Sequence, residues 1–154
     1  MTVKVTIDVK RNLTVNADID RVFSLLSDVQ TSVSHFPNVQ TLTDLGDNAF
    51  RWEMEEVSSG GYSVKTIYAS QYVVDSDAKT ITWTPIKGEG NGLVSGKWEV
   101  TATENGTQLS FSTKAELTLP FPRLLKVVTS PIVKQEFTSL VDTYLNNLKE
   151  LWAQ

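Results

Sequence analysis

The sequence of 154 residues contains no cysteine and only one histidine, His35. Without cysteine the chain has no disulfide, no thiol nucleophile and no thiolate ligand for a metal. A single histidine is also too few for the usual zinc sites, which draw on several Cys and His side chains. We therefore expect no cofactor, although a metal site made of carboxylates alone stays open. His35 ends a predicted short helix, where we expect it to have a positional role rather than a catalytic one.

The sequence also lacks a long apolar run and an excess of positive charge. No apolar stretch reaches the about 18 residues that suggest a membrane-spanning helix, so we expect no integral membrane association. The first 15 residues alternate and carry charges throughout, which indicates a strand rather than a signal peptide. The net charge is −4 with acids and bases interspersed, so we expect no nucleic-acid partner. The expected location is the cytoplasm.

The periodicity of the chain predicts one α+β domain over residues 1–154. Residues 2–15 alternate as a strand, with a break near 10–12 that could hold a bulge. A helix should follow within 16–28, capped by Asn16 and with Asp18 in its first turn. A second short helix should cover 29–36 before Pro37 ends it.

From residue 38 the apolar residues recur with period two, and short turns link each segment to the next. Such links predict an antiparallel meander. Its strands are expected at 38–45, 49–58, 61–75, 79–87, 92–104 and 106–118.

The last element should be a long helix over residues 129–152, capped by Ser130 and with Pro131 in its first turn. Its apolar residues fall on one stripe, which must be buried against the inner face of the sheet. The stripe consists of Val133, Phe137, Leu140, Val141, Tyr144, Leu148 and Leu151.

This order of elements resembles the START-like (SRPBCC) helix-grip superfamily. Local echoes are "VNADIDRVFSLLSDVQ", "HFPNVQTLTDLG" and the final helix, and the sequence is most similar to the polyketide cyclase/dehydrase-like branch. The resemblance implies a curved seven-stranded antiparallel sheet wrapped around the C-terminal helix, with two short helices between strands 1 and 2. It also implies a hydrophobic cavity between helix and sheet. The turns at 58–61, 87–92 and 118–123 should share the rim of that cavity.

The glycine-rich stretch "PIKGEGNGLVSGKWEV" invites comparison with a phosphate-binding loop. Its spacing is one residue short of that motif, and Trp98 stands where Ser or Thr is required. A strand is also predicted where the motif needs a helix N-terminus to face the phosphate. We therefore expect residues 87–92 to be a hairpin at the cavity mouth, either a flexible lip or a plain turn.

Residues on the predicted inner faces are rich in Tyr and Trp, whose polar tips need partners when they are buried. Thr66, Ser70, Gly96 and Thr113 on the same faces should leave space and supply hydrogen bonds. Pockets for apolar ligands have this composition, although the same rings could simply fill a core. The residues predicted to bind a ligand are Trp52, Met54, Tyr68, Tyr72, Trp83, Trp98, Phe111, Phe137 and Tyr144.

Three functions fit these observations. The first is a binding module that holds a small hydrophobic ligand, aromatic, polyketide-like or lipid-like, and has no catalytic residue. The second is an enzyme of the polyketide cyclase/dehydratase type, in which Tyr68, Tyr72 or Glu56 would transfer protons. Against it, Arg51 is assigned to the outer face, whereas arginines in the cavities of related cyclases help to orient the substrate. The third is an interaction protein whose cavity is collapsed.

Overall fold

The computed structural model describes residues 2–59, 62–122 and 126–153. Its main element is a seven-stranded antiparallel sheet with the order β1-β9-β8-β7-β6-β3-β2, as the sequence predicts. The strands of this sheet are β1 (Val3–Val15), β2 (Val39–Gly46), β3 (Ala49–Met54), β6 (Ile67–Asp75), β7 (Thr80–Ile86), β8 (Gly92–Thr103) and β9 (Gly106–Leu119).

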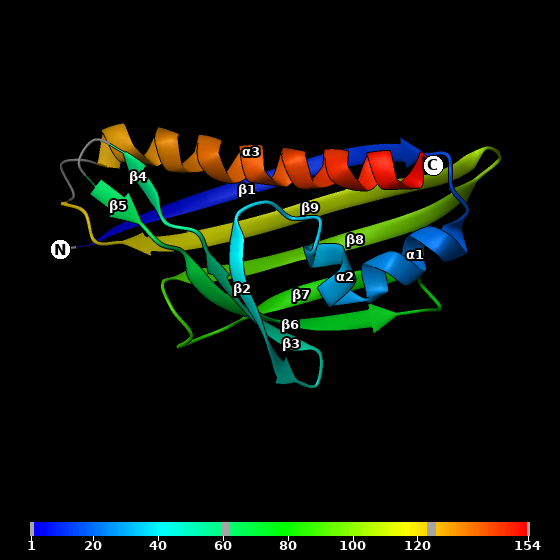
Figure 1. Ribbon diagram of the computed structural model, residues 1–154, viewed down its shortest axis with the longest axis horizontal. Coiled ribbons are helices and arrows are strands. Elements are labelled where there is room, and N and C mark those ends of the chain that lie inside the picture. The colour runs from blue at the N-terminus through cyan, green and yellow to red at the C-terminus, as the bar shows by residue number, and fades with distance from the viewer. Residues whose placement is uncertain (1, 60–61, 123–125, 154) are drawn as a thin grey trace.

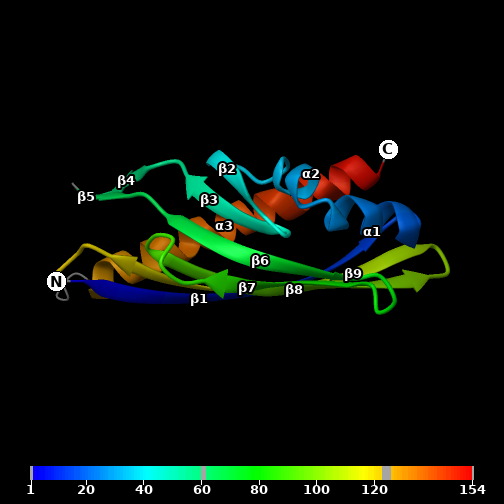
Figure 2. The ribbon, with the colours of Figure 1, turned by 90° about the horizontal axis from the view of Figure 1, so that it is seen from below.

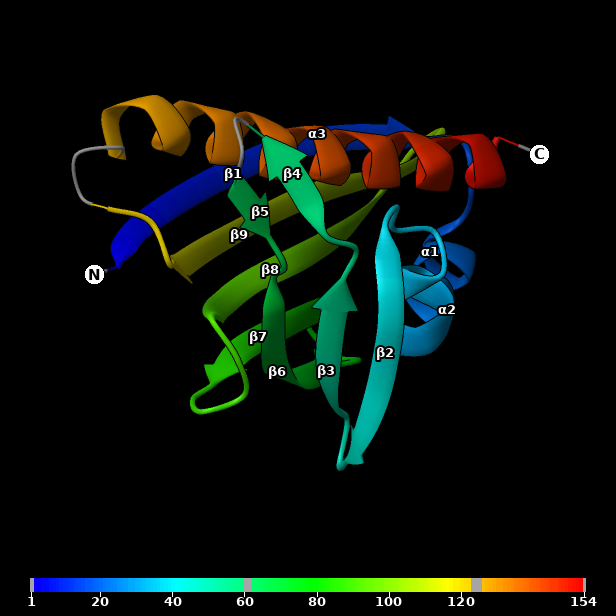
Figure 3. The same ribbon diagram turned by 60° about the vertical axis from the view of Figure 1, so that its left-hand side comes forward.

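Three helices cover one face of this sheet in the described part of the chain. They are α1 (Ile19–Ser27), α2 (Val29–Val33) and α3 (Lys126–Trp152). Helix α3 runs alongside β1, while α1 and α2 lie near its C-terminal end (Figure 1). The sheet curls, so that β2 and β3 run steeply across the direction that α3 and β1 share (Figure 3). This arrangement is the expected helix-grip fold, and no described helix is long and apolar enough to cross a membrane.

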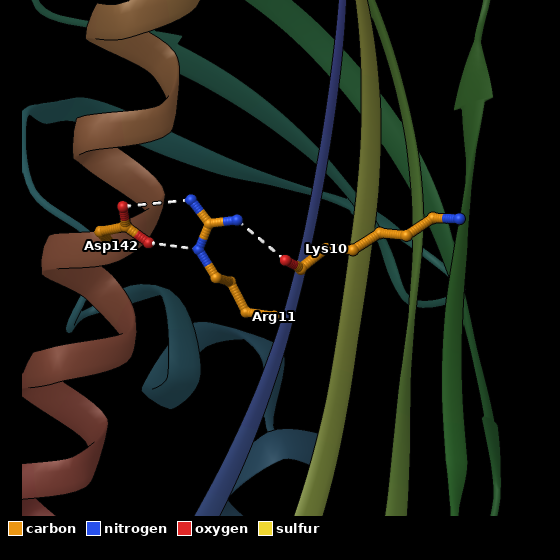
Figure 4. Close-up of polar contacts among 3 residues, drawn as sticks. All are labelled: Lys10, Arg11 and Asp142. Carbon is orange, nitrogen blue, oxygen red and sulfur yellow. Dashed lines mark hydrogen bonds and ion pairs between the residues drawn. The ribbon is translucent and has the colours of Figure 1, made fainter.

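Strand β1 contains no bulge, which corrects the expectation for residues 10–12. Its pairing with β9 continues without a shift from Val3 opposite Leu119 to Val15 opposite Thr107. The apolar alternation is interrupted because Arg11 occupies an inward position. Its guanidinium reaches Asp142 on α3, with Nε donating to Oδ1 at 2.9 Å (Figure 4). The charged residue therefore joins the edge strand to the helix.

Both predicted helix caps are wrong. The N-cap of α1 is Asp18, whose carboxylate accepts a hydrogen bond from the backbone N–H of Arg21 at 2.9 Å, and not Asn16. Helix α3 begins at Lys126, so Pro131 lies inside it and Ser130 does not cap it. Pro131 is the sixth residue of the helix and lies beyond its first turn, so its missing N–H removes one backbone hydrogen bond from α3. The Ser-Pro pair therefore does not mark where α3 begins.

The predicted hairpin of 49–58 with 61–75 is divided into two parts. Strands β4 (Val57–Ser59) and β5 (Tyr62–Val64) form a separate two-stranded sheet. Glu53 pairs with Ile67 and Val57 pairs with Val64, so three residues of one strand lie opposite two of the other. An extra residue of this kind ends the inward-outward alternation.

The end of the molecule away from α1 holds the β4–β5 hairpin, the loop between β7 and β8 and the end of β9 (Figures 1 and 2). The sequence predicts this shared rim from the turns at 58–61, 87–92 and 118–123. Residues 60–61 and 123 lie outside the described residues.

Helix α3 is buried unevenly along its length. No residue from 132 to 140 is buried, and Ile132 is 45% exposed. Further along, the helix has five buried residues, which are Val141, Tyr144, Leu145, Leu148 and Trp152. Burial of apolar surface is the main force that holds a helix to a sheet. The C-terminal half of α3 therefore seals the core, while residues 132–140 are held more weakly.

The closest packing on the inner face of the sheet is at Gly96 in β8, which pairs with Trp83 in β7. The Trp83 indole lies over the glycine, and a Cβ atom there would also come within 2.6 Å of the Ser112 carbonyl oxygen. Thus Gly96 does not leave the open space that the sequence suggests. The absence of a side chain at Gly96 makes room for the Trp83 indole, which fills that space.

Gly96→Ala should therefore destabilise the fold by about 1–3 kcal/mol, because an extra methyl group overpacks this contact. Urea unfolding measures the change. Ser95→Ala, one residue away on the other face of β8, serves as the control and should change stability by less than about 0.5 kcal/mol. Equal stability of Gly96→Ala and the parent protein would contradict the packing described.

Candidate functional site

A cavity of about 60 Å³ lies between the inner face of the sheet, α2 and α3. All but one of the residues predicted to bind a ligand line it. Trp52 (β3), Tyr68 and Tyr72 (β6) and Trp83 (β7) contribute from one part of the sheet. The remaining predicted residues are Trp98 (β8), Phe111 (β9), and Phe137 and Tyr144 (α3). Met54 is buried but is not part of the lining.

The lining rings contact one another as a continuous layer. Trp52 and Tyr68 stack with their centroids 5.4 Å apart and their planes at 20°. Trp98 and Phe111 lie 4.7 Å apart. Offset-stacked and tilted pairs of this kind add to the stability gained from burial alone. The wall of the cavity is therefore a packed aromatic surface.

Helices α1 and α2 also line the cavity, which the sequence analysis did not predict. Their contribution includes Ser32 of α2, and Phe36 just beyond it. Ser32 Oγ lies 2.5 Å from the hydroxyl oxygen of Tyr144, and Phe36 meets Trp52 edge to face at a centroid distance of 5.3 Å. The apolar spacing in 16–28 gave a signal for α1. No local sequence pattern predicts that Ser32 lines the cavity, because its hydrogen-bond partner Tyr144 is 112 residues away.

The small polar side chains of the inner face bond to the protein itself. Ser70 Oγ donates to the backbone carbonyl of Val94 and Thr113 Oγ1 donates to that of Ser95, both at 2.9 Å. Their hydrogens are therefore used within the sheet. Thr66 is only partly buried and does not line the cavity.

Burial raises the pKa of each of the three cavity tyrosines. Desolvation is the main cause in every case, and it raises the pKa of Tyr144 to about 12. The hydrogen bonds of Tyr144 with Ser32 and Trp98 lower its pKa and partly offset that rise. Desolvation likewise places the pKa of Tyr68 and of Tyr72 well above the usual range. All three phenols are therefore neutral at physiological pH.

In the part of the chain that the structure describes, the lining contains no ionisable side chain other than these phenols. Glu56, predicted to reach the rim if it followed the alternation of Trp52 and Met54, is exposed between β3 and β4. The extra residue after Glu53 explains this outcome. Arg51 is partly exposed and pairs with Glu89 at 3.6 Å, outside the lining, as the sequence predicts. His35 is partly exposed, and its Nδ1 lies 3.0 Å from the Thr31 carbonyl oxygen.

The second half of the loop at 87–92 is fixed to the rest of the rim. The side chain of Asn91 accepts from the N–H of Ile67 at 2.9 Å and donates to the carbonyl of Lys65 at 3.0 Å. Gly90 packs against the backbone of Ile67 with a φ of +137°, which favours glycine. Gly92 begins β8 and not a helix, so the geometry of a phosphate-binding loop is missing.

The sequence matches the protein family described as "Polyketide cyclase / dehydrase and lipid transport" over residues 4–152. No curated protein matches the chain in sequence.

Among solved structures, the fold is similar to that of a START superfamily protein from Mycobacterium smegmatis, with a TM-score of 0.68 and 15% identity over 94% of this chain and 96% of that one. It is also similar to TTHA0849 from Thermus thermophilus, with a TM-score of 0.66 and 18% identity over 94% of each chain. A third similar structure is the ZhuI aromatase/cyclase from Streptomyces sp. R1128, with a TM-score of 0.58 and 14% identity over 95% and 96% of the two chains. At these identities the likeness concerns the fold.

The raised pKa of Tyr144 predicts a loss of stability in alkali. An unfolded tyrosine ionises near pH 10, whereas Tyr144 in the fold ionises near pH 12. Between these values the unfolded state binds fewer protons, so the free energy of unfolding falls as pH rises, by about 1.4 kcal/mol per pH unit for one tyrosine. Tyr144→Phe should reduce the slope measured by urea unfolding between pH 10 and 12. Equal slopes for the two proteins would show that Tyr144 ionises normally.

Proposed function

The chain belongs to the polyketide cyclase/dehydrase and lipid transport family, and on that premise we propose that it binds a small hydrophobic molecule in the cavity between α3 and the sheet. The ligand would be aromatic, polyketide-like or lipid-like. The observation that carries this proposal is the continuous aromatic layer around a cavity whose described lining residues include no charged side chain. Apolar pockets with a few placed polar groups are the usual sites for such ligands.

The size of the cavity favours this function over that of an interaction protein with a solid core. A void needs only about 10–15 Å³ to hold one water molecule, so about 60 Å³ is more than a packing defect. Sites for drug-sized ligands, however, occupy about 300–1,000 Å³. Binding therefore requires the cavity to widen. The N-terminal half of α3, which has no buried residue from 132 to 140, is the element best placed to move.

The lining favours binding over catalysis of the cyclase type. Ring closure and dehydration need a group that removes a proton, and such a base works best with a pKa near the operating pH. The three tyrosines have raised pKa values because of desolvation, so they are donors and not bases. Glu56 is exposed and lies outside the lining. The cavity can hold and polarise a carbonyl compound, but it supplies no base of its own.

Binding of the neutral dye 1-N-phenylnaphthylamine tests the proposal, since its fluorescence rises in apolar surroundings. We expect the protein to bind this dye with 1:1 stoichiometry. Phe137→Ala should weaken binding at least threefold, because this ring on α3 lines the cavity. Phe137 is only partly buried, so the variant should still fold.

Val73→Ala is the matched control, because Val73 is apolar and 57% exposed on β6, beside Tyr72 but not in the lining. It should leave the affinity for the dye unchanged. Absence of dye binding, together with no apolar compound extracted from the protein purified from its host, would contradict the proposed function.

A further inference from the structure

The polar groups around the cavity are mostly hydrogen-bond donors. The indole N–H of Trp52 is buried without a partner, and Trp52 is only 6% exposed. The Trp52 N–H lowers the pKa of Tyr72. The Trp52 nitrogen and the Tyr72 oxygen nevertheless do not form a hydrogen bond of good geometry. Among the described residues, no hydrogen bond is found in which the hydroxyl of Tyr68 or Tyr72 donates, although neither oxygen is one of the fully buried unpaired atoms.

The fourth donor belongs to the pair formed by Ser32 and Tyr144. Two hydroxyl groups 2.5 Å apart share one hydrogen bond, so one of their two hydrogens is not used in it. The other polar side chain of the lining, Thr113, already donates to a backbone carbonyl. Buried polar groups are normally paired, because an unpaired one costs about 1–3 kcal/mol. In the described part of the chain these donors find no acceptor, so their hydrogens are available to an acceptor on a ligand.

The same lining disfavours a charged ligand. Among residues 2–59, 62–122 and 126–153, the lining contains no Lys, Arg or His to pair with an anion, and no Asp or Glu to pair with a cation. Removing an unpaired charge from water costs several kcal/mol even after the surroundings relax. A pure hydrocarbon would fill the space but would leave the donors unpaired.

From this surplus of donors we propose that the ligand is an uncharged molecule whose carbonyl or ether oxygen accepts hydrogen bonds from the hydroxyl groups of Tyr68 and Tyr72. This inference rests on the proposed ligand-binding function and makes it more specific. The Trp52 N–H is close enough to the Tyr72 oxygen to lower the pKa of that phenol, and it is a further donor beside this pair. Because desolvation raises the pKa of both tyrosines, they keep their hydrogens at every physiological pH.

Three single-ring probes of similar size separate the effects of hydrogen bonding and charge from the effect of ligand shape. Acetophenone carries a carbonyl, ethylbenzene has no acceptor, and benzoate is an anion. Titration of the ¹⁵N-labelled full chain at pH 7.5, followed by two-dimensional NMR, gives a dissociation constant for each. We expect acetophenone and ethylbenzene to shift resonances of cavity residues, and benzoate to bind at least tenfold more weakly than acetophenone.

Tyr68→Phe and Tyr72→Phe, made separately, remove one donor each and keep the ring. Each should weaken acetophenone binding about three- to tenfold, the usual range for one hydrogen bond, and leave ethylbenzene within twofold. Neither hydroxyl donates to a described residue, so thermal unfolding should show both variants folded as the parent is. Phe111→Leu is the matched control, since it removes ring surface from the same lining and should weaken both neutral probes by similar factors.

The outcomes distinguish this inference from the function on which it rests. If the tyrosine variants weaken acetophenone and ethylbenzene equally, or if benzoate binds as tightly as acetophenone, the cavity still binds ligands and the proposed ligand chemistry is wrong. If neither neutral probe nor 1-N-phenylnaphthylamine binds the parent protein, the binding function fails, and this inference fails with it.

Discussion

The unequal packing of α3 against the sheet is the constraint on which the other features depend. From Val141 onward the helix buries all its apolar side chains but Leu151, which is partly buried, and burial of this kind fixes its position. Between 132 and 140 it buries none. The ion pair of Arg11 with Asp142 lies at the transition between these parts, with both side chains more than a third exposed. Exposed ion pairs contribute only about 0–1 kcal/mol to the stability of a protein. This ion pair therefore orients α3 on the sheet more than it stabilises the fold. The cavity exists because α3 does not pack completely against the sheet.

The aromatic layer suits the protein both with and without a ligand. Without a ligand its rings pack as part of the core, and with a ligand they form the wall of the binding site. Rings that stack, such as Trp52 on Tyr68, stabilise the closed state through mutual contact. The indole N–H of Trp52 remains without a hydrogen-bond partner in that state. A ligand that enters between the rings and α3 therefore gains apolar contact and supplies acceptors. The same residues would then explain why the empty protein folds and why it binds.

Sequence periodicity predicted the sheet, the final helix and nearly all the lining aromatics, because strand alternation fixes which face a side chain takes. Its errors occur where distant partners override local pattern. Arg11 was mistaken for a bulge because Asp142 is 131 residues away. The single extra residue after Glu53 removed Glu56 from the inner face. The volume of the cavity could not be predicted either, because it depends on how Trp83 lies over Gly96.

Native-state amide hydrogen exchange along α3 tests the central claim most directly, because exchange reports where a structure opens locally. The account predicts that amides from 132 to 140 exchange faster than those from 141 to 152. It also predicts that a bound neutral aromatic ligand changes the exchange rates mainly in the first of these segments. Uniformly slow exchange along the whole helix, unchanged by ligand, would contradict a cavity that opens beneath its N-terminal half.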